Sequence, residues 1–259
     1  MKQRTITAVI ALLIFIPIIW VGSWLLLLAA LVLAAIGVYE FYQMKYPTEQ
    51  RFLEMGLAIL ASWTLILPLD GLNINRLLVY YIVVMALMIC TVFQQKKYSI
   101  DTIGFPIFVS LYLGLGFSYL VVARLSGFVL LLFALCVVWA TDIGAYLVGR
   151  AIGRHKLAPL VSPNKTIEGS IGGVLSAMIV TIIFMIYAGE KFPYSFGIML
   201  VLTVLFSLAG QFGDLVESAY KRHYGVKDSG KILPGHGGIL DRFDNLLFVF
   251  PIMALFGLF

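Results

Sequence analysis

The strongest constraint on this chain is the series of long apolar stretches that runs through nearly all of it. Of the 259 residues, 61% are hydrophobic and only 12% are charged. So much apolar sequence cannot be enclosed in a water-soluble core, because too few polar residues remain to cover the outside. We therefore expect an integral membrane protein.

Nine stretches approach the length that a helix needs to cross a bilayer, which is about 20 residues for a hydrocarbon core about 30 Å thick. They cover residues 5–20, 23–41, 52–69, 77–93, 103–122, 128–148, 167–187, 196–212 and 246–259. The alternating pattern of a membrane β-barrel is absent, so helices are the only element expected. No internal repeat or low-complexity linker interrupts the series. The sequence predicts an all-α, polytopic helical bundle that forms a single membrane domain over residues 1–259.

The distribution of Lys and Arg predicts how these helices are oriented. With the N-terminus in the cytoplasm, 15 of the 18 basic residues, Lys96 and Lys97 among them, fall in cytoplasmic segments, as the positive-inside rule requires. Arg76, Arg124 and Lys191 are the exceptions. One missed helix would reverse the side of every later loop, so the bias supports nine helices. The net charge of +5 then reflects topology, and nucleic acid is not an expected partner.

The content of the chain changes near residue 125. The earlier loops are short, whereas long cytoplasmic loops follow near 149–166 and 213–245, and acids appear in or beside the apolar stretches. We predict a scaffold half, residues 1–125, and a catalytic half, residues 126–259.

Polar chemistry is concentrated in residues 218–245. These 28 residues hold five Lys or Arg, three Asp, two His and five Gly. Cations neutralise phosphate oxygens, carboxylates bind Mg²⁺, and glycines let the backbone approach a ligand closely. A basic loop in a membrane protein can simply mark topology. The acids and the Gly-His-Gly-Gly sequence at 235–238 instead favour a phosphate-rich ligand that carries a metal.

The same segment closely resembles the signature of phosphatidate cytidylyltransferases, also called CDP-diacylglycerol synthases. The matching residues are Ser218, Lys221, Arg222, Lys227, Asp228, Gly230, Pro234, His236, Gly237, Gly238, Asp241, Arg242, Phe243 and Asp244. Tyr220 departs from the pattern, which prefers an aliphatic residue or Phe there. The resemblance also covers residues 139–173 well, and the remaining stretches only by hydropathy.

This resemblance implies that CTP and phosphatidic acid react to give CDP-diacylglycerol and pyrophosphate. It also implies a homodimer. The carboxylates make Mg²⁺ or another divalent cation the expected cofactor, and the loop charges predict an active site at the cytoplasmic face of the cell (inner) membrane. The setting agrees, because a diacyl lipid stays in the bilayer, CTP stays in water, and the charged segment is predicted at their boundary.

Asp214, Glu217, Ser218 and Lys221 follow the spacing i, i+3, i+4 and i+7, so on a helix they share one face. Such a polar stripe at the end of an apolar stretch forms either a salt-bridged seam or the wall of a cavity. We favour the cavity wall, given the polar segment that follows.

Asp214 and Asp241 are the expected metal ligands, and Asp244 is expected as an additional ligand or in the surrounding shell. Mg²⁺ prefers one or two carboxylates together with substrate phosphates and water. The structural alternative for Asp244 is an ion pair with Arg242 or Lys221.

Residues 162–173 form a second candidate region. Ser162 or Asn164 could cap the helix predicted from residue 167, and a helix N-terminus beside a Lys binds anions. The resemblance supports phosphate binding by Ser162 and Lys165. The glycines at 169, 172 and 173 are expected to permit close helix packing.

Asp142 lies near the end of the stretch 128–148. A carboxylate in hydrocarbon is costly, so Asp142 should face water, the protein interior or a cation. A structural pair with a Lys or Arg is the alternative, but the resembling family places this segment beside the active site. His236 is the candidate for contact with the triphosphate or the lipid phosphate, while His223 and Glu217 receive no role.

The full set of predicted site residues combines both regions. The catalytic candidates are Asp214, Lys221, Arg222, His236, Asp241 and Asp244. The substrate-binding candidates are Asp142, Ser162, Lys165, Ser218, Lys227, Asp228, Gly237, Gly238 and Arg242.

Two other functions fit parts of the pattern. One is a CTP-dependent enzyme that acts on another lipid phosphate, such as a polyprenyl or ether lipid. The other is a secondary transporter of an anionic solute, in which buried acids would conduct protons. The absence of repeat symmetry and the crowding of charge at one face argue against the transporter.

Overall fold

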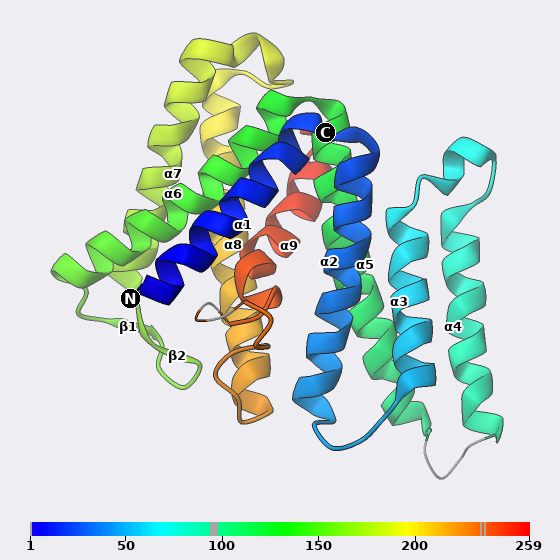
Figure 1. Cartoon of the computed structure of the whole chain (residues 1–259). Coiled ribbons are helices and arrows are strands. Elements are labelled where there is room, and N and C mark those ends of the chain that lie inside the picture. The colour runs from blue at the N-terminus through cyan, green and yellow to red at the C-terminus, as the bar shows by residue number, and fades with distance from the viewer. Residues whose placement is uncertain (1, 94–97, 234, 236) are drawn as a thin grey trace. The chain divides into compact units, whose positions relative to one another are not determined.

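The computed structural model describes residues 2–93, 98–233, 235 and 237–259. The residues Lys96, Lys97, Pro234 and His236, which carried sequence-based predictions, lie outside this described part. The described elements, in chain order (Figure 1), are α1 (Lys2–Val21), α2 (Ser23–Lys45), α3 (Phe52–Ile66), η1 (Leu69–Leu72), α4 (Arg76–Phe93), α5 (Ile100–Ser126), α6 (Phe128–Ile152), β1 (Lys156–Ala158), β2 (Ser162–Thr166), α7 (Ile167–Ala188), η2 (Gly189–Lys191), α8 (Phe196–His223) and α9 (Leu240–Leu255). The expectation of an all-α class is confirmed.

Six helical segments of the described chain are long and apolar enough to cross a membrane. They are α2, α4, α5, α6, α7 with η2, and α8. The helix α3 is apolar but shorter, with 15 residues. These helices make the protein a multi-pass membrane protein, whereas the count of nine spans and the cytoplasmic N-terminus stay predictions.

Two helices that carry site residues are longer at the polar end than hydropathy indicates. The helix α8 continues past residue 212 to His223, and α9 begins at Leu240 instead of 246. Hydropathy marks only the apolar part of a helix, whereas intrahelical hydrogen bonds continue as long as polar side chains find partners. As a result, Asp214 and Asp241 lie on helices and not in a loop.

The polar connection between α6 and α7 contains a short strand pair, which the sequence analysis did not predict. β1 and β2 form an antiparallel pair in which Lys156 lies opposite Thr166 and Ala158 lies opposite Ser162 (Figure 1). The rule that favours helices applies inside hydrocarbon, where every backbone group must be satisfied locally. A polar connection in water is free of that constraint.

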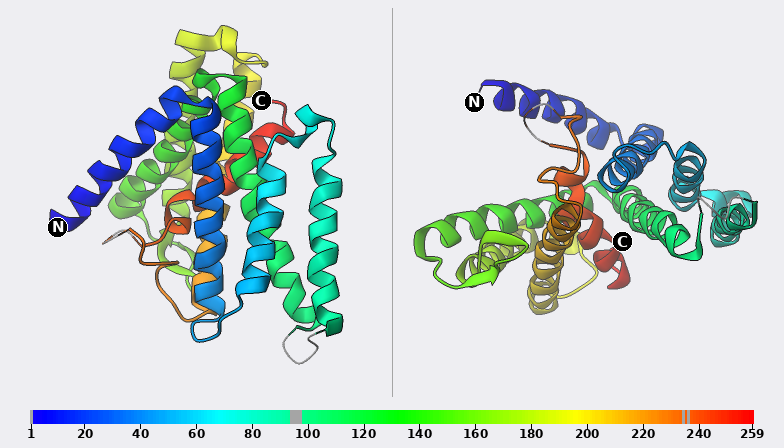
Figure 2. Two further views of the ribbon diagram at one scale, coloured as in Figure 1. Left: turned by 45° about the vertical axis from the view of Figure 1, so that its right-hand side comes forward. Right: turned by 90° about the horizontal axis from the view of Figure 1, so that it is seen from below.

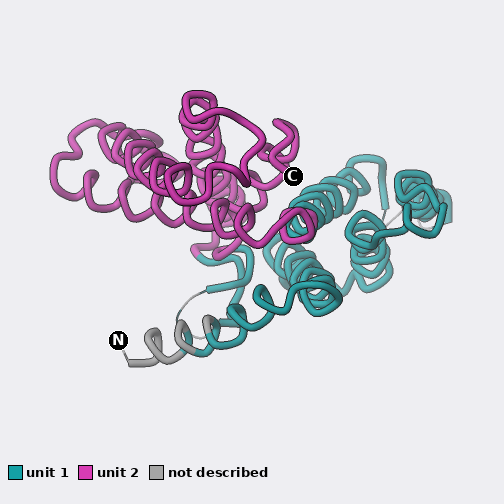
Figure 3. Tube along the Cα trace, turned by 90° about the horizontal axis from the view of Figure 1, so that it is seen from above, with its two compact units in different colours: residues 1–121, 228–240 teal, residues 122–227, 241–259 magenta. Residues whose placement is uncertain are grey.

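The chain forms two compact units (Figure 3). Unit 1 comprises Met1–Val121 and Asp228–Leu240, and unit 2 comprises Val122–Lys227 and Asp241–Phe259. The segment 228–240 therefore packs with the N-terminal helices, although it belongs to the sequence signature.

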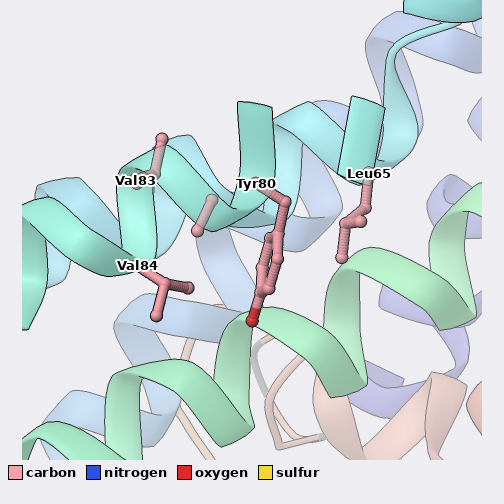
Figure 4. Close-up of a cluster of buried hydrophobic side chains, with 5 residues drawn as sticks. Leu65, Tyr80, Val83 and Val84 are labelled. Carbon is pink, nitrogen blue, oxygen red and sulfur yellow. The ribbon is translucent and has the colours of Figure 1, made fainter. Parts of the chain in front are cut away.

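Part of the core of unit 1 lies between α3, α4 and α5. The neighbouring helices α3 and α4 run in opposite directions (Figure 2). Leu65, Tyr80, Val83 and Val84 pack together there, and the Tyr80 hydroxyl points toward α5, where it lies 3.2 Å from the Ser110 hydroxyl (Figure 4).

A second core cluster of unit 1 fixes α2 against α5. The ring of Phe41 is fully buried and meets Phe105, Phe108 and Tyr112 edge to face, with centroids 6.2–6.3 Å apart. Such aromatic pairs contribute about 0.5–1.5 kcal/mol each beyond their buried area. The end of α2 is therefore a rigid part of the unit.

In unit 2, α6 and α7 pack through glycines. A Cβ on Gly169 would lie 2.7 Å from the carbonyl oxygen of Ala145, and one on Gly173 would lie 2.8 Å from that of Thr141. A Cβ on Gly172 would collide with Val148. The predicted packing role of these three glycines is confirmed.

Cysteine labelling can test the predicted topology. In a chain whose Cys90 and Cys136 have been replaced, we expect Leu160→Cys and Lys231→Cys to resist an impermeant thiol reagent in intact cells. Leu160 is 94% exposed and Lys231 is also exposed, so protection would reflect sidedness and not burial.

The matched control is Leu72→Cys. Leu72 is 70% exposed and lies in a segment predicted to face the outside, so this cysteine should react. Labelling of Leu160→Cys or Lys231→Cys from outside would contradict the predicted orientation.

Candidate active site

The helices α8 and α9 approach each other closely in unit 2 because glycines line one face of α8. A Cβ on Gly213 would lie 2.6 Å from the carbonyl oxygen of Asp244, and one on Gly210 would lie 3.2 Å from Val249. No larger side chain fits at residue 213 without moving backbone. This contact brings the first turns of α9 beside the polar stripe of α8.

Lys221 lies between two acids at this contact. Its ammonium group donates to Glu217 Oε2 at 2.7 Å and to Asp241 Oδ1 at 2.6 Å. The side chains of Lys221, Glu217 and Asp241 are 11%, 2% and 9% exposed, so the group is nearly removed from solvent. One cation is shared by two carboxylates, and Lys221 contacts Asp241 rather than Asp244.

A second ion pair joins β2 to α8. Lys165 Nζ lies 2.6 Å from Asp214 Oδ2, and the Ser218 hydroxyl donates to Asp214 Oδ1 at 3.2 Å. The Lys165 and Asp214 side chains are 27% and 32% exposed, so both remain accessible. The predicted common face of Asp214, Ser218 and Lys221 is consistent with these contacts.

The N-terminus of α7 corrects one detail of the sequence analysis. Thr166, and neither Ser162 nor Asn164, is the N-cap, and its hydroxyl accepts from the backbone N–H of Gly169 at 3.1 Å. Ser162 and Asn164 belong to β2, because strand pairing continues up to the start of the helix.

Glu168 ties the hairpin to α7. Its Oε2 accepts from the backbone N–H of Arg154 at 3.1 Å, and its Oε1 lies 2.6 Å from His155 Nδ1. The carboxylate thus ties the chain just before β1 to the first turn of α7.

Asp142 of α6 is held by α9. Both of its carboxylate oxygens accept from Asn245 Nδ2 at 2.9 Å. The hydrogen-bond partner of Asp142 is therefore an amide. The sequence analysis gave Asn245 no role, although it closes the segment 218–245, because an amide at the start of an apolar helix carries no signal of its own.

Four of the side chains described above, Asp142, Lys165, Thr166 and Asp214, line a pocket of about 460 Å³ in unit 2. Its walls hold both acids Asp142 and Asp214 and both cations Arg150 and Lys165. The other lining residues are Ala145, Tyr146, Gly149, Leu157, Asn164, Thr166, Gly169, Ser170 and Gln211. A cavity with converging charges of both signs can bind a polyanion together with a cation.

Of the polar stripe on α8, Asp214 belongs to the wall of this cavity. Glu217 and Lys221 instead form a salt-bridged seam with Asp241 and are not among the lining residues, so the cavity-wall prediction was wrong for them.

The remaining predicted residues are not among those that line this pocket. Arg222 donates to the carbonyl oxygen of Val226 at 3.2 Å, and Lys227 and Arg242 are exposed. Asp228, Gly237 and Gly238 belong to unit 1, and Ser162 lies in β2. Their predicted roles, like that of His236, stay predictions.

The acids suit Mg²⁺ by their chemistry. In the part of the chain that the structure describes, no three His, Cys, Asp or Glu side chains converge as a ready-made metal site. Asp214 and Asp241 each contact a Lys. Among the described residues, no hydrogen-bond partner reaches the buried Glu217 Oε1. Mg²⁺ needs only one or two protein carboxylates when substrate phosphates and water complete its shell. Carboxylates are the donor type that Mg²⁺ prefers, and the roles of Asp214, Asp241 and Asp244 as metal ligands stay predictions.

Comparison with known proteins identifies the family. Residues 2–259 match the model of the "Cytidylyltransferase family". The chain is 43% identical to a protein of Staphylococcus saprophyticus, 42% to one of Staphylococcus haemolyticus and 41% to one of Staphylococcus aureus, each named phosphatidate cytidylyltransferase. Each match covers 98% of this chain and 98% of the relative. The chain belongs to the cytidylyltransferase family.

The contact at Gly213 predicts a stability effect. Gly213→Ala should lower the thermal unfolding midpoint in detergent, because overpacking against backbone costs about 1–3 kcal/mol. Gly197→Ala is the matched control on the same helix, since a Cβ there meets nothing within 4 Å. Equal midpoints for the two variants would contradict the close approach of α8 and α9.

Proposed function

We propose that this protein is the enzyme that makes CDP-diacylglycerol for phospholipid biosynthesis. It transfers the cytidylyl group of CTP to phosphatidic acid and releases pyrophosphate. The observation that carries the proposal is the pocket in which Lys165 meets Asp214, in a membrane-embedded member of the cytidylyltransferase family. The names of its relatives support the lipid phosphate as acceptor.

The reaction needs one bond made and one bond broken at phosphorus. An oxygen of the lipid phosphate attacks the α-phosphorus of CTP in line, and the bond from that phosphorus to the bridging oxygen of the β-phosphate breaks. Pyrophosphate leaves with the electron pair. The nucleophile is already an anion, so general-base help is minor and no covalent enzyme intermediate is required.

The main barrier is repulsion between the lipid phosphate and the triphosphate. Lys165, which lines the pocket, would offset this repulsion, and preorganised charges of this kind stabilise the charge that develops in the transition state. Lys221 is held between Glu217 and Asp241, and its contribution to catalysis stays a prediction. We predict that Arg222, Lys227 and Arg242 contribute further positive charge. Mg²⁺ held by Asp214 and Asp241, with Asp244 as a further ligand, would neutralise phosphate oxygens when bound.

The proposed location follows from the substrates. Phosphatidic acid keeps its acyl chains in the bilayer, whereas CTP is a cytoplasmic solute. We place the enzyme in the inner membrane with its active site at the cytoplasmic face. The homodimer implied by the family resemblance stays a prediction.

A direct assay tests the function. Purified protein in detergent should convert α-labelled CTP and phosphatidic acid into a labelled liponucleotide, with pyrophosphate as the second product. Polyprenyl phosphate and an ether-lipid phosphate, supplied separately, test the alternative acceptor. A higher kcat/KM for either lipid than for phosphatidic acid would overturn the assigned substrate.

Removal of divalent cations should stop the reaction. In EDTA we expect no CDP-diacylglycerol formation, because Asp214 and Asp241 would otherwise repel the triphosphate, and excess Mg²⁺ should restore it. A parallel sample with EDTA already saturated by Mg²⁺ controls for the chelator itself. An unchanged rate in EDTA would show that the carboxylates do not act through a metal.

Asp241→Asn removes the negative charge of residue 241 and keeps the size of its side chain. We expect the rate to fall at least about 100-fold, which corresponds to about 2.7 kcal/mol of transition-state stabilisation. The variant should still insert and purify as the wild type does, since Lys221 keeps its contact with Glu217.

The control for this prediction is Asp70→Asn. The Asp70 side chain is 59% exposed and pairs with Arg76 at 3.1 Å, and exposed pairs contribute little. It should leave the rate unchanged. If Asp241→Asn retained more than about a tenth of the wild-type rate, Asp241 would not be a principal metal ligand.

A further inference from the structure

Glu40 is a buried acid that neither the sequence analysis nor the proposed mechanism uses. It lies near the end of α2 in unit 1, and only 1% of it is exposed. A carboxylate in such surroundings is costly unless polar groups surround it. Its partners therefore indicate what it is for.

Three donors to Glu40 lie in the segment 228–240, about 200 residues later in the chain. The Ser229 hydroxyl donates to Glu40 Oε2 at 3.0 Å. The backbone N–H groups of Ile239 and Leu240 donate to Oε1 at 2.8 Å and to Oε2 at 2.9 Å. Hydrogen bonds to an ionised acceptor are shorter and stronger than neutral ones. Both carboxylate oxygens are thus bound by one segment of chain.

At two glycines of the same segment, the backbone passes so close to this carboxylate that a side chain would not fit. A Cβ on Gly230 would lie 2.6 Å from Glu40 Oε1, and one on Gly238 would collide with Glu40 and with the Ser229 hydroxyl. Residues 230 and 238 must therefore be glycine because the Glu40 carboxylate occupies the space that a side chain would need. The sequence analysis had linked the glycines of this region to close approach of a ligand.

Glu40 also completes the start of α9. The first N–H groups of a helix have no partner within the helix, and an anion there is favoured by the helix dipole. Leu240 is the first residue of α9, and its N–H and that of Ile239 both donate to Glu40. A side chain of α2 thus caps a helix that begins 200 residues later. Asp241 is the next residue of that helix.

The segment has little regular structure of its own to hold it. Among its described residues, the backbone pairing given by the structure is a single bridge between Leu233 and Gly237, with a hydrogen bond of 3.0 Å. By contrast, α2 is fixed by the aromatic cluster around Phe41, the residue after Glu40. The carboxylate therefore links a rigid helix to an irregular segment.

We propose that Glu40 is a positioning residue for cytidylyl transfer: it anchors the segment 228–240 and fixes the point where α9 begins, without touching either substrate. The proposal rests on the function proposed above, and it assigns a catalytic purpose to the N-terminal half of the chain. Its structural part, the anchoring, can be measured independently of activity.

Glu40→Gln is the sharpest variant, because it keeps the shape of the side chain. The new amide N–H₂ must face Ile239 N–H on one side, or Leu240 N–H and the Ser229 hydroxyl on the other, so donors would oppose donors. We expect hydrogen exchange of the peptide covering residues 229–240 to become at least about tenfold faster, with α6 and α8 unchanged. The kcat should fall at least about tenfold.

Glu40→Asp keeps the charge on a shorter side chain and should recover part of both losses. Glu54→Gln is the matched control. Glu54 is also a buried acid of unit 1, 1% exposed, but its carboxylate accepts from Arg51 at 3.3 Å. This variant should leave exchange at 229–240 and the kcat within about twofold of wild type, whatever it does to the thermal midpoint.

A double-variant cycle tests the contact itself. Gly230→Ala should lower kcat in the wild-type background, because its methyl group meets the Glu40 carboxylate. The same change should have a smaller effect in a Glu40→Ala background, where that carboxylate is absent. Additive effects of the two changes would overturn the assigned packing.

The outcomes separate the two proposals. Fast exchange at 229–240 with kcat within about twofold of wild type would overturn the positioning role, and unchanged exchange would overturn the anchoring. If the wild type itself made no CDP-diacylglycerol, the proposed function would fail while the exchange result still reported on Glu40.

Discussion

The interaction on which the site depends is the sharing of Lys221 between Glu217 and Asp241. These three side chains are nearly buried at the end of apolar helices, where an unpaired charge would cost several kcal/mol. Each charge is tolerable because the others are present. The close contact of α8 and α9 at Gly213 places the acids on both sides of the cation. The close packing of α8 against α9 thus permits a charged site in an apolar bundle.

The rest of the site is positioned by short polar structure attached to those helices. The hairpin β1–β2, tied to α7 by Glu168, presents Lys165 to Asp214, and Asn245 of α9 holds Asp142. The pocket consequently collects charge from α6, α8 and the hairpin. An enzyme that joins a membrane lipid to a soluble nucleotide needs such charge beside apolar surface, because one substrate stays in the bilayer and the other stays in water.

Much of this could be predicted from the sequence, and what could not has a physical reason. Hydropathy located the helices because burial in lipid requires long apolar runs, and the spacing of Asp214, Ser218 and Lys221 identified a common face. Hydropathy could not show that α8 and α9 extend into polar sequence, nor that a strand pair precedes α7. Glu40 and Asn245 were missed because their roles come from partners 103 or more residues away. Spacing along the chain carries no information about such contacts.

The central claim is that the buried charges on α8 and α9 serve catalysis and not stability. Replacing a buried ion group with apolar residues of similar size is often neutral or stabilising for the fold. The direct test is the thermal unfolding midpoint of the triple variant Glu217→Met, Lys221→Met and Asp241→Leu, measured with CDP-diacylglycerol formation in the same detergent preparation. The account predicts a midpoint equal to or above that of the wild type and no detectable product. A variant that unfolds well below the wild type, or one that still makes CDP-diacylglycerol, would contradict it.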